Sequence, residues 1–154
     1  MDEDGQLLEQ WRAGVDAAGQ KLFRRHFTSV HRFFSYKVGD DDDELAQASF
    51  LAAVESRERI STSFRGYLFG VARKQLLRFF EGRGRGLPAD ALSVRSVVDL
   101  APTPSRVIVK NQDLAALVTA MQHIPVDCQV ALELYYWEEM STAEIGEALG
   151  SSQV

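Results

Sequence analysis

The chain lacks what several classes of protein require. Its 154 residues include a single cysteine, Cys128, which excludes an internal disulfide framework and fits a reducing compartment. No segment approaches the roughly 20 consecutive apolar residues that span a bilayer. The acidic start, residues 1–11, also lacks the apolar run of a signal peptide. These absences predict a soluble, cytoplasmic protein with no membrane partner.

Groups that carry catalytic chemistry are scarce as well. His26 and His31 are five residues apart on one expected helix and His123 lies in another part of the chain, so no metal-ligand spacing exists. Cys128 has no histidine at helical spacing, and we expect it to be a buried structural thiol. The three glycines at 82, 84 and 86 alternate with arginine and follow no strand, unlike a phosphate-binding loop. We expect no enzyme, no cofactor and no metal ion.

Charge is distributed unevenly along this acidic chain. Residues 57–85 contain eight basic and two acidic side chains, a net charge of +6, whereas residues 1–56 carry −5 and residues 87–154 carry −6. Aromatic residues are interleaved with the cations of the basic segment. Cations concentrated on one element of an otherwise negative chain predict a local site for a polyanion. Nucleic acid is therefore expected to bind along one edge of the molecule.

Hydrophobic periodicity predicts an all-α fold, because apolar residues recur at spacings of three and four and no segment alternates like a strand. The expected helices span residues 6–14, 16–38, 44–56, 64–81, 105–124, 126–137 and 141–149. Ser141 and Glu144 have the spacing of a capping box at the start of the last helix. The apolar sets of the second and third helices, expected to be buried, are Leu22, Phe23, Phe27, Val30, Phe33, Phe34, Leu45, Phe50, Leu51 and Val54.

A change of composition divides the chain. Residues 84–104 contain Pro88, Pro102 and Pro104 and show no sustained apolar period, which is typical of a linker. We therefore predict two small helical domains, residues 1–83 and 105–154, with residues 84–104 as the linker. The two domains are expected to lack a continuous common core and to move relative to each other unless a partner or a direct interface locks them.

Two parts of the chain resemble bacterial sigma factors of the sigma-70 family, most closely the extracytoplasmic-function type. Residues 43–51 (DELAQASFL) and 64–73 (FRGYLFGVAR) are similar to region 2, and residues 124–150 are similar to region 4. A helix-turn-helix pattern alone is common. Similarity to region 2 followed by similarity to region 4 is a more specific signal, and together the resemblance covers nearly the whole chain. Two residues depart from the family pattern: Ala48 stands where an acidic residue is usual, and Lys74 where Asn is frequent. Region 4 normally continues into a basic recognition helix that reads the −35 element, so the resemblance implies an incomplete helix-turn-helix here.

The resemblance implies that the helix beginning near Asp43 docks on the β′ clamp helices of the RNA polymerase core. The implied polymerase contacts are Asp43, Glu44, Gln47, Ala48 and Leu51. Gln47 is the strongest candidate, because it projects from the side opposite Phe50. The aspartates before position 43 are better explained as helix-start charge.

The resemblance also implies that residues 57–63 and the helix after them open the promoter −10 element and bind its non-template strand. Base pairs melt when unstacked bases find a replacement surface beside cations that hold the backbone. The implied DNA-binding residues are Arg57, Arg59, Ser61, Thr62, Ser63, Arg65, Tyr67, Arg73, Lys74 and Arg78. Phe64, Phe79 and Phe80 are assigned to core packing, while Tyr67 fits core and interface about equally.

The leading hypothesis is a transcription initiation factor that brings RNA polymerase to promoters and helps to melt the −10 element. The alternative is a regulatory interaction module that binds polymerase or an anti-sigma protein without full promoter recognition. A helix-turn-helix repressor of duplex DNA is disfavoured, because the strongest cations lie outside the helix-turn-helix segment.

Overall fold

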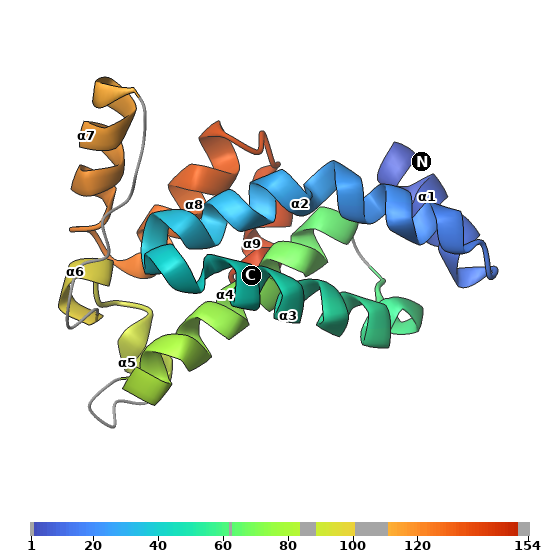
Figure 1. Cartoon of the computed structure of the whole chain (residues 1–154), viewed down its shortest axis with the longest axis horizontal. Coiled ribbons are helices and arrows are strands. Elements are labelled where there is room, and N and C mark those ends of the chain that lie inside the picture. Colours follow the sequence, from blue (N-terminus) through green and yellow to red (C-terminus); the bar gives the residue numbers. More distant parts are fainter. Residues whose placement is uncertain (1, 62, 84–88, 101–110, 151–154) are drawn as a thin grey trace.

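The computed structural model describes residues 2–61, 63–83, 89–100 and 111–150, and these residues are almost entirely helical (Figure 1). They form no β-strand, only an isolated bridge between Ser96 and Pro125. The prediction of an all-α fold is confirmed. The helices are α1 (Glu3–Arg12), α2 (Asp16–Val38), α3 (Asp42–Ser56), α4 (Phe64–Arg83), α5 (Ala89–Leu92), α6 (Val97–Leu100), α7 (Gln112–Met121), α8 (Val126–Tyr136) and α9 (Thr142–Ala148), with short 3-10 helices η1 (Gly39–Asp41) and η2 (Arg57–Arg59).

Local chemistry fixes several helix ends. Gly39 has φ of 63° after α2, in the left-handed region that favours glycine at a helix end. Ser141 accepts a hydrogen bond from the Glu144 backbone, and the Glu144 carboxylate accepts one from the Ser141 backbone. The predicted capping box at the start of α9 is therefore confirmed.

Helices α2, α3 and α4 build the first layer of the core, with α1 packed on α2. Phe34, Phe69 and Phe80 are among the most completely buried side chains. Phe33 joins neighbouring helices, since its ring contacts both Phe34 and Phe69. Phe64 and Phe80 are buried, as expected. None of the described helices has the length and apolar character needed to cross a membrane.

Three residues of the expected apolar sets lie on the surface. Phe23, Leu51 and Val54 are 41%, 59% and 42% exposed, so their expected burial was wrong. Helix α3 buries a narrow stripe of mostly small residues: Ala46, Ser49, Phe50 and Ala53. Leu51 and Val54 fall outside this stripe. Cys128, expected to be buried, is exposed, because α8 turns a different set of side chains inward.

The two halves of the chain share one core, contrary to the expectation of separate cores. Buried residues of α8 and α9 belong to the same hydrophobic cluster as those of α2 and α4: Val126, Val130, Leu134, Ile145 and Ala148. Part of the expected linker is folded as well, since Leu92, Val97 and Leu100 of α5 and α6 are buried. A direct interface therefore joins the halves, while the domain boundaries remain a prediction.

Helix α9 approaches α4 at backbone level. A Cβ atom placed on Gly70 would lie 3.5 Å from both the Cα and the carbonyl oxygen of Ala148. One placed on Gly66 would lie 3.5 Å from the carbonyl oxygen of Glu144. Because residues four apart share one helix face, these two glycines let α9 lie directly against the first turns of α4.

Candidate polymerase and nucleic-acid interfaces

The structure divides the ten expected DNA-binding residues by exposure. Arg59, Ser61, Lys74 and Arg78 are exposed on the loop and on the later turns of α4. A second group is partly buried: Arg57, Ser63, Arg65, Tyr67 and Arg73. Thr62 lies outside the described residues. The exposed residues are open to a ligand, and two of the partly buried arginines, Arg65 and Arg73, are paired with carboxylates of the other half of the chain.

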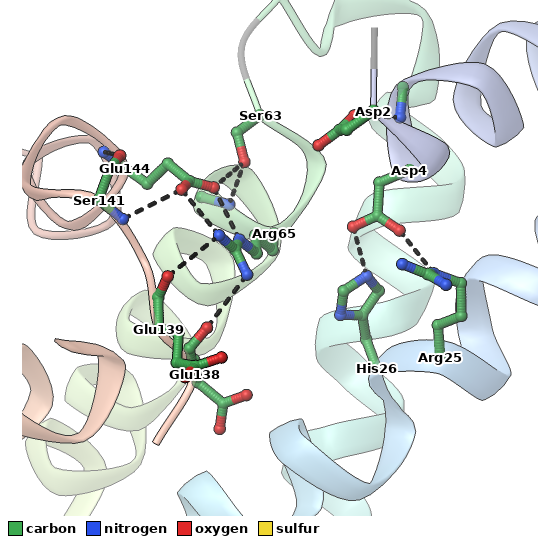
Figure 2. A network of polar contacts seen from close by, with 12 residues as sticks. Asp2, Asp4, Arg25, His26, Ser63, Arg65, Glu138, Glu139, Ser141 and Glu144 are labelled. Carbon is green, nitrogen blue, oxygen red and sulfur yellow. Dashed lines mark hydrogen bonds and ion pairs between the residues drawn. The ribbon is translucent and has the colours of Figure 1, made fainter. Parts of the chain in front are cut away.

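Arg65 is the centre of a polar network between α4 and the start of α9 (Figure 2). Its Nε and Nη2 donate to the two carboxylate oxygens of Glu144 at 2.8 and 3.0 Å. Its Nη1 donates to the carbonyl oxygen of Glu138 at 3.0 Å. The Ser63 hydroxyl donates to the same Glu144 carboxylate at 2.6 Å. This forked geometry is the strong form of the arginine–carboxylate pair.

These contacts shift the ionisation of Glu144. Hydrogen bonds from Arg65 lower the pKa of Glu144 from 4.5 to about 2, against burial and with smaller help from Ser63 and Ser141. The same pairing raises the pKa of Arg65. Both groups are therefore charged throughout the physiological range.

Arg73 makes a second pair of the same kind. Its Nε and Nη2 donate to the two carboxylate oxygens of Asp127, at 2.7 and 3.0 Å. Asp127 lies in the first turn of α8. Two of the arginines expected to hold phosphates are thus bound by carboxylates from the other half of the chain.

Helix α2 joins the same interface. Arg32 pairs with Glu138 at 2.6 Å, and its guanidinium lies 5.8 Å from the centre of the Trp137 ring. Lys37 Nζ lies 2.6 Å from a carboxylate oxygen of Glu133, and both side chains are almost fully buried. Burial lowers the pKa of Lys37 and raises that of Glu133.

Helix α1 supports the loop before α4, a role that sequence reasoning missed. The Arg12 guanidinium donates to the carbonyl oxygens of Arg57 and Ile60. The Arg57 guanidinium in turn lies 5.3 Å from the centre of the Trp11 ring. Arg12 lies at the end of a short amphipathic helix, where a cation commonly compensates the helix dipole. Nothing in the local sequence indicates that this side chain contacts a residue 45 positions later.

Asp4 holds α1 on α2. Its carboxylate accepts hydrogen bonds from Arg25 Nε at 2.8 Å and lies 2.7 Å from His26 Nε2 (Figure 2). Burial acts to raise the pKa of Asp4, but the hydrogen bonds from His26 and Arg25 outweigh it and lower the pKa. This anchored helix gives Arg12 a fixed position beneath the loop.

The expected polymerase contacts form an exposed row on α3. Glu44, Gln47 and Leu51 are exposed at spacings of three and four, so they share one face of the helix. Asp43 is exposed at the same end, and Ala48 is half-buried beside the row. Gln47 is exposed and Phe50 is buried, but residues three apart are neighbours on a helix surface, so the two side chains do not lie on opposite sides of α3.

One group of side chains has the ligand types of a metal site. His31, Asp42 and Asp43 place one potential ligand atom each within 4.8 Å of one another. Histidine spacing alone missed this group, because two of its members are aspartates from another helix. His31 Nε2 lies 2.8 Å from Asp43 Oδ1, and this contact already gives the imidazole a partner at the start of α3.

Comparison with known proteins shows similarity to sigma factors. Residues 114–153 match the family model described as "Sigma-70, region 4". The chain is also 22% identical over 156 residues to the ECF RNA polymerase sigma factor BldN of Streptomyces coelicolor. That match includes 96% of this chain and 58% of the relative, so the chain spans little more than half of that protein's length. In both comparisons, therefore, the chain is similar to sigma factors of the sigma-70 family, and the relative is of the extracytoplasmic-function type.

Proposed function

We propose that this chain is a non-enzymatic transcription initiation factor that binds the RNA polymerase core in the cytoplasm and directs it to promoters. The observation that carries the proposal is the match of residues 114–153 to sigma-70 region 4 in a chain whose other half holds a separate basic edge. The sigma factor relative supports the same role. Two surfaces of the structure suit the two partners, polymerase and promoter DNA.

The exposed row on α3 is the proposed polymerase surface. Leu51 is 59% exposed between polar neighbours, and an apolar side chain amid polar ones suits a helix-on-helix contact. Gln47 lies one turn earlier and Glu44 two turns earlier on the same face. The proposed partner is the pair of β′ clamp helices, which would bury Leu51 and leave the fold of α3 unchanged.

The loop before α4 and α4 itself are the proposed site for the non-template strand of the −10 element. Arg59, Lys74 and Arg78 are exposed cations that can hold phosphates, whereas the loop around Ser61 can enclose an unstacked base. Arg12 holds this loop at two carbonyl groups. A supported loop loses less conformational freedom when it closes on a base.

One observation favours the alternative, a regulatory module that binds polymerase or an anti-sigma protein without full promoter recognition. Arg65 and Arg73 are engaged by Glu144 and Asp127. Helix α9 also lies on the turns of α4 that the −10 strand would need. In this arrangement polymerase can reach α3, but a nucleic-acid strand cannot reach both arginines.

Reconstituted transcription separates the two proposals. Purified chain is mixed with polymerase core, and co-elution measures core binding; promoter-dependent transcripts and permanganate reactivity of the −10 element measure initiation. Core binding with transcripts and an open −10 element is the result expected of an initiation factor. Core binding without −10 opening would favour the regulatory module, and absence of core binding would contradict both.

A further inference from the structure

We propose that α8 and α9 form a reversible cover on the basic edge of α4, in which the carboxylates of Asp127 and Glu144 stand in the places of nucleic-acid phosphates. The proposal rests on the proposed function where it names the displaced ligand as a single strand of nucleic acid. Binding of that strand then requires α9 to leave α4. The same contacts keep the free chain closed.

Arg65 and Arg73 bind carboxylates with the geometry that suits a phosphate. Arg65 and Arg73 each direct two N–H groups at a single carboxylate, which is also how arginine binds a phosphate. Their side chains are only 33% and 16% exposed. While the carboxylates are in place, neither guanidinium can offer the same fork to a strand.

Helix α9 keeps its own N-terminal cap when its contact with α4 is broken. Glu144 accepts hydrogen bonds from Arg65 and also from the Ser141 backbone within its own capping box. When Arg65 leaves, the capping box remains. At the contact, Gly66 and Gly70 let the α9 backbone approach closely, and Ile145 and Ala148 are the α9 side chains buried in the shared core. Helix α9 can therefore separate as an intact helix.

Buried polar groups lower the stability of the interface between α2 and α8. Lys37 and Glu133 form a fully buried ion pair between α2 and α8. The side-chain oxygen of Gln129, also buried, has no hydrogen-bond partner among the described residues. Burying charged and unpaired polar groups costs free energy, and the attraction between Lys37 and Glu133 offsets only part of this cost. Water would satisfy these atoms after opening, so the closed arrangement is less stable than an apolar core of the same size.

The experiment compares two variants of the full chain with equal net charge. Glu144→Gln with Asp127→Asn removes both carboxylates of the cover, and Gln at 144 still suits the capping box. Glu139→Gln with Asp113→Asn removes two exposed carboxylates elsewhere in the same half. Circular dichroism checks that both variants are folded.

Opening is measured by the distance between spin labels on Cys128, the single cysteine, and on Cys introduced by Lys21→Cys on α2. We expect one narrow distance for the unaltered chain and for the Glu139/Asp113 control. The Glu144/Asp127 variant should give a broader and longer distribution. Identical distributions in all three proteins would overturn the cover. The exchanged pair Arg65→Glu with Glu144→Arg should restore the narrow distance that Arg65→Glu alone loses.

The ligand is a fluorescent −10-like single-stranded oligonucleotide. Its Kd should fall about tenfold in the Glu144/Asp127 variant, the usual scale of coupling between two states, and stay unchanged in the control. Excess oligonucleotide should also lengthen the label distance in the unaltered chain. Tight binding with the narrow distance retained would overturn the cover. An opened variant that binds no oligonucleotide would overturn the proposed DNA site, while its label distances would still support the cover.

Discussion

Arg65 Nε lies 2.8 Å from Glu144 Oε2, although the two residues are 79 positions apart in the chain. Arg65 belongs to the segment that carries +6, and Glu144 to the segment that carries −6. The uneven charge along the sequence therefore has a structural counterpart: the acidic half lies on the basic helix of the other half.

The Arg65–Glu144 pair should make stability depend on pH at acidic values. The folded pKa of Glu144, about 2, is below its ordinary 4.5, so ionised Glu144 favours the folded state. Its contribution is complete above about pH 4.5 and is lost as the pH falls toward 2. Urea unfolding of Glu144→Gln should lack this part of the pH dependence. The same pH dependence in the variant and in the unaltered chain would show that other carboxyl groups account for it.

A larger side chain at Gly70 should open the cover without unfolding the helices beneath it. A Cβ on Gly70 would make ordinary contacts of 3.5 Å with Ala148, so Gly70→Ala should be tolerated. Gly70→Leu has no room and should displace α9. Hydrogen exchange should then increase in α9 and in the first turns of α4 while protection of α2 is retained. Unchanged protection of α9 in Gly70→Leu would contradict this packing.

The buried Lys37–Glu133 pair should respond differently to single and double replacement. Lys37→Met leaves an uncompensated carboxylate in the core and should lower the free energy of unfolding by about 3–5 kcal/mol. Replacing both residues by Met removes both charges and should recover most of this loss. The double variant should also remain closed by the label-distance measurement, because its interface is apolar. A double variant as unstable as Lys37→Met would mean that the shape of the pair, and not its charge, is required.

Gln47→Ala should weaken binding to the polymerase core by several-fold while the melting temperature stays nearly constant, since an exposed polar residue contributes little to folding. Gln20→Ala, which removes an exposed glutamine of α2, is the matched control. Equal losses of core affinity in both variants would place the polymerase surface elsewhere.

Arg12→Ala should loosen the loop before α4, because the side chain holds the carbonyl oxygens of Arg57 and Ile60. Hydrogen exchange around residues 57–61 should rise, and discrimination between −10-like sequences should fall more than total affinity. Arg12→Lys should behave like Arg12→Ala, because lysine lacks the planar guanidinium that donates to two carbonyl groups at once. If Arg12→Ala discriminated between sequences as well as the unaltered chain, support of the loop by Arg12 would not contribute to sequence preference.

Much of the local structure could be predicted from the sequence. The bounds of α2 and the capping box of α9 depend on residues close together in the chain, and their expected positions agree with the structure. The interface could not be predicted in this way. Periodicity reports which face of one helix is apolar, but not that Arg73 meets Asp127 54 positions later. Periodicity also predicted burial of Leu51, which is exposed. The buried face of α3 is formed by Ala46, Ser49, Phe50 and Ala53, and Leu51 lies outside it.

The most direct test of the central claim is the salt dependence of binding of the −10-like single strand. With Glu144→Gln and Asp127→Asn in place, Arg65 and Arg73 are free before the strand arrives, so no ion pairs are broken on binding. Each additional phosphate contact on a single strand steepens the plot of log K against log salt by about 0.7. We predict a slope steeper by about 1.4 than that of the unaltered chain, for two such contacts. Equal slopes in the two proteins would contradict the claim that these carboxylates occupy the phosphate positions of α4.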